Sequence, residues 1–213
     1  MRKIHVHLVF TLLSLGILLL GVNLTPLFDW DELNFAESAR EMNLTQNYLD
    51  IQIVFEPFWE KPPFFIWMQA LAERLFQTND PWVYKLPNVI TGVLAVNWVY
   101  HLGDRLGKRM LGAFWALATL FTFAPFIYWR SGIIDPVFNF FIVLSIYQWY
   151  KITQANLKDE RSHLYYLLVG IFLGFAFLTK GPVAIGIVGF VVLWVSAARG
   201  KWYEIFNWKL ILS

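Results

Sequence analysis

Apolar and polar segments alternate along this chain on a scale of tens of residues. A helix that crosses a membrane needs about 17 to 25 mostly apolar residues, and successive apolar stretches approach this length. They cover residues 6–24, 86–102, 110–129, 137–150, 164–179 and 182–198. We therefore predict an all-α, polytopic membrane protein with about six transmembrane helices.

The polar connection at about residues 28–85 is the longest, and its own pattern predicts an amphipathic helix near its start. Asp31 is suited to cap this helix, and Glu37, Arg40 and Glu41 are expected on its polar face. The expected apolar face, with helical spacing, consists of Leu33, Ala36, Ala39 and Met42.

A second amphipathic helix is predicted at residues 64–76, directly after Pro62 and Pro63, whose fixed φ suits the start of a helix. About 13 residues are too few to cross a membrane comfortably, so both helices are expected at the membrane interface. The expected polar edge of the second helix consists of Gln69, Glu73 and Arg74. Residues 48–58 alternate loosely, which predicts an extended segment between the two helices.

The composition agrees with a membrane location, since 58% of the residues are hydrophobic, 19% aromatic and only 15% charged. The first apolar stretch is long and lacks a small-residue cleavage site, which favours a retained span over a signal peptide. With the N-terminus in the cytoplasm, most Lys and Arg fall on the inner side and most Asp and Glu on the outer side, in line with the positive-inside rule. The basic residues form no continuous face, so no nucleic-acid partner is expected.

Cysteine is absent, which excludes disulfides and thiol catalysis. The histidines all fall on or near the predicted inner side, so an outer site built from this chain would contain no histidine. Residues 206–213 begin a further apolar run and then stop. We therefore expect residues 1–213 to be the N-terminal part of a longer protein.

The first candidate chemistry lies in two charged turns of the predicted outer loop. Asp31 and Glu32 follow the first span, where they act either as helix-end acids or as a general base that accepts a proton from an acceptor hydroxyl. Glu60 and Lys61 precede the two prolines. They form either a surface ion pair or a site in which Lys61 binds a phosphate and Glu60 a divalent cation.

Two further outer turns carry candidate residues. Asp135 precedes Pro136 between the third and fourth spans, where an acid is a common turn residue and also a possible site carboxylate. Lys180 precedes Gly181 after the fifth span. Its ammonium group either reaches lipid headgroups or contacts an anionic group in a site.

The ordered set of these motifs resembles the polyprenyl- and dolichyl-phosphate-dependent glycosyltransferases of the GT-C fold, in particular the aminoarabinose transferases and protein mannosyltransferases. The resemblance extends from Asp31 to Pro182. It is carried by Asp31-Glu32, Phe35-Ala36-Glu37, Ala39-Arg40-Glu41-Met42, Phe58-Trp59-Glu60-Lys61-Pro62-Pro63-Phe64-Phe65-Ile66-Trp67, Lys85-Leu86-Pro87, Asp135 and Leu178-Thr179-Lys180-Gly181-Pro182. Lys85 departs from the arginine that the family usually has there.

The resemblance implies transfer of a sugar from a polyprenyl phosphate to a lipid A, protein or glycan acceptor, with inversion, on the outer face of the cytoplasmic membrane. A divalent metal ion is compatible with this reaction, and no nucleotide cofactor is expected. The implied roles are catalytic for Asp31 and Asp135, donor-phosphate binding for Lys61, Arg40 and Lys180, metal binding for Glu60 and support for Glu32.

Two other classes of protein remain open from the residues alone. A transporter or flippase subunit would use outer carboxylates to relay ions, but the charges lie in loops and no inverted repeat is evident. A non-catalytic membrane scaffold of the same fold would tolerate the loss of Asp31 and Lys61.

Overall fold

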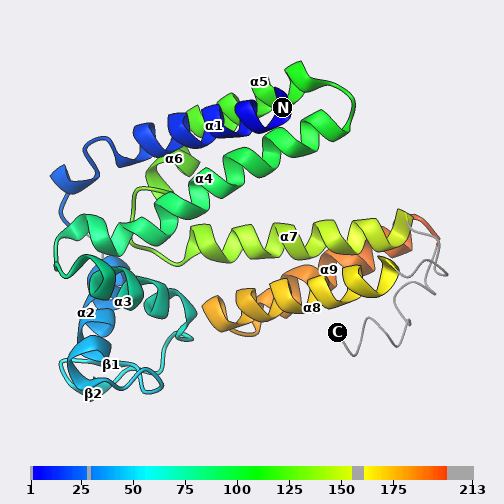
Figure 1. Cartoon of the computed structure of the whole chain (residues 1–213). Coiled ribbons are helices and arrows are strands. Elements are labelled where there is room, and N and C mark those ends of the chain that lie inside the picture. The colour runs from blue at the N-terminus through cyan, green and yellow to red at the C-terminus, as the bar shows by residue number, and fades with distance from the viewer. Residues whose placement is uncertain (1, 28–29, 155–160, 201–213) are drawn as a thin grey trace. The chain divides into compact units, whose positions relative to one another are not determined.

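The computed structural model describes residues 2–27, 30–154 and 161–200, and within these ranges the chain is almost entirely helical (Figure 1). In chain order the helices are α1 (Arg2–Leu19), the short 3-10 helix η1 (Val22–Leu24), α2 (Trp30–Thr45), α3 (Phe64–Phe76), α4 (Pro81–Arg105), α5 (Arg109–Phe121), α6 (Phe123–Tyr128), α7 (Asp135–Gln154), α8 (Arg161–Lys180) and α9 (Val183–Ala198). The prediction of an all-α fold is confirmed. The predicted apolar run at residues 206–213 lies outside the described residues.

The chain divides into two compact units. The first unit combines Met1–Trp59 with Phe65–Pro136, and the second combines Glu60–Phe64 with Val137–Ser213. The short segment Glu60–Phe64 therefore belongs to the unit formed by the C-terminal helices, although it lies within the first predicted outer loop.

In the first unit, α1 and α5 lie alongside α4 (Figure 1). Their contact is made by a buried apolar core that consists of Phe10, Leu18, Val89, Val93, Val96, Tyr100, Ala116, Leu120 and Trp129. The helices α4 and α5 approach closely at Gly103 and Gly112, where a Cβ atom on Gly112 would lie 2.6 Å from the carbonyl oxygen of Tyr100. Side chains at these two positions would force the helices apart.

The predicted first amphipathic helix is present as α2, but its buried face differs from the prediction. Leu33 is 51% exposed, whereas Phe35, Ala36, Ala39 and Met42 are buried. The ring of Phe35 packs edge-on against Phe65 of α3, with 6.0 Å between the ring centroids. This aromatic contact turns the helix so that Glu32 and Glu41, rather than Leu33, share the buried side.

The predicted bounds of the second amphipathic helix are confirmed by α3, but its polar edge is not. Gln69 is fully buried and Glu73 is 8% exposed, while only Arg74 is exposed. Both buried side chains have hydrogen-bond partners from other elements. Polar groups can be buried at little cost when they are paired in this way, so side-chain polarity alone did not identify the exposed face.

Between α2 and α3 the chain forms a small antiparallel hairpin of β1 (Gln52–Ile53) and β2 (Glu56–Pro57). This agrees with the predicted extended segment. The two turn residues, Val54 and Phe55, have positive φ angles of 56° and 60°. A two-residue hairpin turn requires this conformation, which glycine or asparagine adopts more easily.

In the second unit, α7, α8 and α9 pack on a core that includes Phe138, Ile142, Trp149, Tyr166, Val169, Ala176, Ala184, Val188 and Val192. The segment Glu60–Phe64 is attached to them through Phe64. The ring of Phe64 lies 4.9 Å from that of Phe175 and 5.8 Å from that of Phe141, centroid to centroid.

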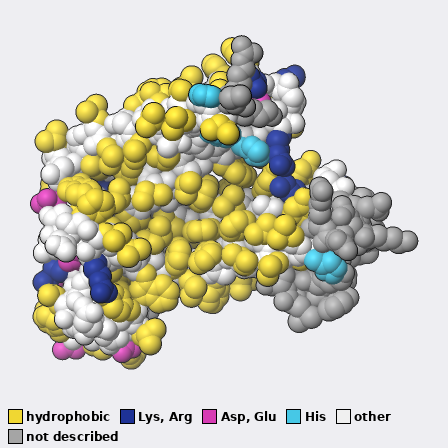
Figure 2. Space-filling view, viewed as in Figure 1, with side chains coloured by type: hydrophobic (Ala, Val, Ile, Leu, Met, Phe, Trp, Pro, Cys, Tyr) yellow, Lys and Arg dark blue, Asp and Glu magenta, His cyan; other side chains and the backbone are white. Residues whose placement is uncertain are grey.

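Many helical surfaces of both units are apolar (Figure 2). Exposed large hydrophobic side chains include Leu8, Leu12, Phe114, Phe121, Phe190 and Trp194. Within the described residues, two stretches are long and apolar enough to cross a membrane, Ile4–Leu24 and His163–Lys180, and the shorter helices Arg109–Phe121 and Val183–Ala198 are also apolar. Exposed apolar surface of this extent is typical of helices that face lipid.

The third predicted span is wrong as one continuous helix. It is divided into α5 and α6 at Thr122, whose backbone is extended with φ −70° and ψ 130°. Pro125 explains the break, since its ring would clash with the carbonyl group four residues earlier, at Phe121, in an unbroken helix.

Candidate active site

The first candidate carboxylates lie in the first turn of α2. The helix begins at Trp30, so Asp31 lies inside it and is not the cap that the sequence predicted. Asp31 is partly exposed, whereas Glu32 is 1% exposed. Free backbone N–H groups at a helix start favour negative charge, so this turn stabilises both carboxylates, one accessible and one buried.

The buried carboxylate of Glu32 connects α2 to the segment before α7. Its Oε1 atom accepts a hydrogen bond from the backbone N–H of Gly132, a hundred residues further along the chain. The charge of Lys85, on α4, also acts electrostatically on Glu32. Glu32 therefore has a structural role beside the accessible Asp31.

Side chains from α3 and α4 fix the same segment. The amide of Gln69 donates to the carbonyl oxygens of Tyr84 at 2.8 Å and Gly132 at 3.3 Å. The amide of Asn88 donates to those of Ser131 at 2.8 Å and Ile133 at 2.6 Å. We call Glu32, Gln69 and Asn88 the loop clamp, because together they bind the backbone of residues 131–133.

The loop clamp brings the start of α2 next to the segment that leads into Asp135. Asp135 is the first residue of α7, in the turn where a carboxylate interacts favourably with the helix dipole. Asp31, Glu32 and Asp135 are thus positioned by one buried polar network of the first unit. The sequence indicated the acids but not Gln69 or Asn88, and the only signal for Asn88 was a polar residue within an apolar run.

Lys85 has a related role just before the start of α2. Its Nζ atom donates to the carbonyl oxygen and the hydroxyl of Thr25, at 2.7 and 2.8 Å. These bonds hold the chain between η1 and α2. Lys85 therefore has a structural role in this region.

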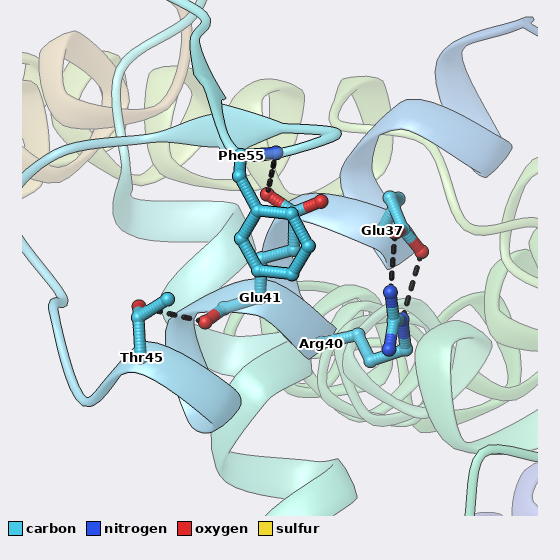
Figure 3. Close-up of polar contacts among 5 residues, drawn as sticks. All are labelled: Glu37, Arg40, Glu41, Thr45 and Phe55. Carbon is cyan, nitrogen blue, oxygen red and sulfur yellow. Dashed lines mark hydrogen bonds and ion pairs between the residues drawn. The ribbon is translucent and has the colours of Figure 1, made fainter.

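Arg40 is paired within its own helix (Figure 3). Its guanidinium group donates to both carboxylate oxygens of Glu37, at 2.9 Å from Nε and 2.6 Å from Nη2. The hydrogen bond from Arg40 lowers the pKa of Glu37 from its ordinary value, and the same bond raises the pKa of Arg40. A phosphate that binds Arg40 would have to displace Glu37 or share the guanidinium group with it.

Glu41 supports the hairpin from the next turn of α2 (Figure 3). Its Oε2 atom accepts a hydrogen bond at 3.0 Å from the backbone N–H of Phe55, one of the two residues with positive φ. The carboxylate is almost fully buried. Glu41 therefore compensates for the unfavourable backbone of the hairpin turn.

The candidate lysines belong to the second unit. Lys61 Nζ lies 2.8 Å from Glu60 Oε1, with the Glu60 side chain 53% exposed and that of Lys61 22% exposed. Lys180, the last residue of α8, places its Nζ atom 5.6 Å from the centroid of the Phe138 ring. Both lysines lie beside aromatic or proline-rich segments.

The turn that follows Lys180 contacts the proline-rich segment that follows Lys61, and the contact is at Gly181. Its φ of 73° is left-handed, and its N–H donates to the carbonyl oxygen of Phe177 at 2.7 Å, which ends α8. A Cβ atom at this position would lie 3.9 Å from Cγ of Pro62. The turn that follows Lys180 and the Glu60–Pro63 turn are therefore neighbours within the second unit.

The described residues do not supply a complete metal site. Across residues 2–27, 30–154 and 161–200, no three His, Asp or Glu side chains come together around a possible ion. Glu60 contributes one carboxylate, and that carboxylate is paired with Lys61. A divalent cation at Glu60 would need ligands from other parts of the protein.

The almost entirely helical fold and its apolar surfaces are typical of a membrane protein. The chain belongs to the dolichyl-phosphate-mannose-protein mannosyltransferase family, whose model matches residues 8–211.

Among curated proteins, the chain is similar to undecaprenyl phosphate-alpha-4-amino-4-deoxy-L-arabinose arabinosyl transferases. It is 28% identical over 203 residues to that of Edwardsiella ictaluri, which covers 92% of this chain and 36% of the relative. It is 24% identical over 183 residues to transferase 1 of Proteus mirabilis, with 85% and 33% covered. The chain thus spans about a third of the length of these relatives.

Among solved structures, the fold is shared with ArnT from Cupriavidus metallidurans. The apo structure matches with a TM-score of 0.85 at 20% identity, over 100% of this chain and 39% of that one. The structure bound to undecaprenyl phosphate matches with a TM-score of 0.84 at 21% identity, over 97% and 38%. The expected GT-C transferase fold is confirmed.

Proposed function

We propose that this chain forms part of an integral membrane glycosyltransferase that takes its sugar from a polyprenyl-phosphate donor. The main support is the family match over residues 8–211. The curated relatives are named as transferases that use an undecaprenyl-phosphate-linked sugar, and one structure with the same fold contains undecaprenyl phosphate. The proposed product has an inverted anomeric carbon.

In the proposed reaction, Asp31 accepts the proton of the attacking acceptor group or orients that group. The side chain suits this role because it is partly exposed at a helix start, whereas the adjacent Glu32 is buried and hydrogen-bonded. A general base must reach the proton that it removes. Asp135 is proposed as a second carboxylate of the site, and Glu32 as the residue that supports both.

Lys61 is proposed to bind the donor phosphate. Negative charge increases on this phosphate as its bond to the sugar breaks, and a fixed cation stabilises that charge more strongly in the transition state than in the ground state. Lys61 is suited to this role because the two prolines that follow it restrict its backbone. Lys180 and Arg40 are proposed as further contacts to the donor, and Arg40 would first have to exchange its bond to Glu37.

Glu60 is proposed as one ligand of a divalent metal ion, with the remaining ligands contributed by segments beyond the described residues. The acceptor is proposed to be a lipid A, protein or glycan group. We also propose that the full protein has about six spans in this part, a cytoplasmic N-terminus and a site on the outer face of the cytoplasmic membrane.

The test is transfer of radiolabelled sugar from polyprenyl phosphate in membranes that contain the full-length protein. Asp31→Asn and Lys61→Ala are each expected to lower transfer by about 100-fold or more. Lys108→Ala, at an exposed position outside the proposed site, is the matched control and is expected to retain transfer. Unchanged transfer in both site variants would overturn the assignment and favour the scaffold or transporter.

A further inference from the structure

A polar cavity of about 320 Å³ lies at the C-terminal ends of two helices in the first unit, apart from the residues given roles above. The cavity lies where α2 ends at Thr45 and α3 ends at Phe76. Its lining consists of Asn43, Gln46, Glu73, Arg74, Gln77, Thr78 and Asn79. Cavities that bind small molecules begin at about 300 Å³. The cavity is therefore large enough for a small polar ligand.

Two glutamines with unusual backbone conformations flank this cavity. Gln46 and Gln77 directly follow α2 and α3, and their φ angles are 57° and 50°. Glycine or asparagine usually occupies this position at a helix end, because a larger side chain is strained there. Strained residues of this kind concentrate at functional sites. This indicates a functional role for the side chains of Gln46 and Gln77.

The wall of the cavity is fixed by a partly buried hydrogen-bond network. Asn43 donates to Oε2 of Glu73 at 3.0 Å and to the carbonyl oxygen of Ala70 at 2.9 Å, and it accepts a bond from the hydroxyl of Tyr48 at 3.0 Å. Glu73 is 8% exposed, and this burial raises the pKa of its carboxyl group. Such a network holds polar groups in place before a ligand arrives.

Other lining groups remain available for a ligand. Among the described residues, the side chains of Arg74, Gln77 and Asn79 form no hydrogen bond or ion pair with the protein, although all three line the cavity. Their amide and guanidinium groups supply both donors and, from the amides, acceptors. One side of the cavity is thus held by hydrogen bonds within the protein, and the other side presents the polar side chains of Arg74, Gln77 and Asn79 to a ligand.

The chemistry of the lining narrows the class of ligand. One carboxylate, Glu73, and one guanidinium, Arg74, offset each other in charge, and every other lining group is an amide or a hydroxyl. No lining side chain is aromatic or aliphatic, which disfavours an apolar ligand. A single carboxylate among these side chains is too few for a bound divalent cation, and it disfavours a strong anion. A ligand with several neutral hydroxyl groups on a small ring matches this lining, because each hydroxyl group can both donate to and accept from the lining side chains.

We propose that this cavity binds an uncharged, hydroxyl-rich saccharide unit. The proposal rests on the cavity and its side chains and does not depend on the transfer reaction or on Asp31 and Lys61. The saccharide is either free in solution or the headgroup of a glycolipid, since both present the same hydroxyl groups.

Binding is measured directly by saturation-transfer difference NMR with a panel of methyl glycosides and the full-length protein in nanodiscs. Nanodiscs are needed because glycoside detergents would compete for the cavity. At least one methyl glycoside is expected to give saturation transfer at millimolar concentration. Nanodiscs that also contain a glycolipid with the same sugar are expected to abolish the signal if the source is a headgroup and to leave it intact if the source is soluble.

Gln77→Gly tests whether the signal comes from this cavity. Glycine removes the side chain and also suits the positive φ, so the variant is expected to keep or raise its thermal stability while it loses at least fivefold in saturation transfer. Arg74→Ala combined with Asn79→Ala is expected to show the same loss. Gln154→Ala, an exposed glutamine at the end of α7, is the control that keeps the signal. Equal signals in all variants, or no signal for any glycoside, would overturn the proposal.

Discussion

The two units hold their candidate residues by different physical means. In the first unit, the accessible Asp31 and Asp135 depend on the loop clamp, a set of buried hydrogen bonds that joins distant segments. In the second unit, Lys61 and Lys180 are placed by prolines, a left-handed glycine and aromatic packing. A buried polar network is costly to leave half-satisfied, whereas the ion pair between Lys61 and Glu60 is partly exposed to solvent.

This difference predicts that stability and activity are separable in the second unit but coupled in the first. A residue that supports the carboxylates cannot be changed without weakening the fold around it. A lysine of the second unit can be changed while the fold remains intact.

Glu32→Ala is expected to have the largest effect, a loss of about 2 to 4 kcal/mol in the free energy of unfolding. The substitution leaves the buried N–H of Gly132 without its acceptor and opens a cavity. Glu32→Gln is the matched control, because its amide oxygen can still accept that bond, and it is expected to lose less than half as much. Chemical unfolding in detergent micelles measures both. Equal losses in the two variants would show that charge, and not the hydrogen bond, holds the segment.

Gly181→Ala is expected to be the most destabilising of the small changes in the second unit, at about 1 to 2 kcal/mol. The nearest atom to a new Cβ is 3.9 Å away, so the cost arises from the left-handed backbone and not from a clash. Gly186→Ala is the matched control, since it lies inside α9 with no neighbouring atom within 4 Å. It is expected to stabilise the protein by up to about 1 kcal/mol. Effects of the same sign at both glycines would contradict the argument.

Glu73→Gln is expected to raise the melting temperature by about 2 °C at pH 7. Burial raises the pKa of Glu73 above its ordinary value of 4.5, so the folded state favours the protonated form. The wild-type protein should therefore lose stability as the pH rises above 4.5, because the unfolded chain releases its proton first. The variant lacks this loss, and the difference between the two proteins should vanish near pH 4. A difference that stays constant across this range would exclude the carboxyl group as its cause.

The local patterns of the sequence predicted the helices well, and the partners of the polar residues poorly. Hydrophobic spacing and the two prolines were enough for the bounds of α3, because these signals act over a few residues. The burial of Gln69 and Glu73 was missed because their partners lie 63 and 30 residues away along the chain. The break at Thr122 was visible in principle, since Pro125 restricts the turn before it.

In the candidate site, too, local signals were visible in the sequence and distant partners were not. Asp31, Lys61 and Asp135 were predicted as candidates from residue type and order, which a single sequence displays, and their roles stay predictions. The loop clamp was not, because the acceptor and donor groups on residues 131–133 belong to the backbone, and a backbone group has no signature in the sequence. Whether Glu60 binds a metal ion and whether Arg40 contacts a phosphate stay predictions.

Lys61→Ala is expected to have the smallest effect on stability, less than about 0.5 kcal/mol. The pair that it forms with Glu60 is partly exposed, so solvent and salt screen most of the attraction. The Phe64 ring, which attaches this segment to α7 and α8, is unaffected by the change. Thermal unfolding of the variant should therefore match the wild type at low and high salt, while sugar transfer falls. A clear loss of stability, abolished by salt, would mean that the ion pair holds this turn in place, and the contrast between the two units would then disappear at the residue proposed to bind the donor phosphate.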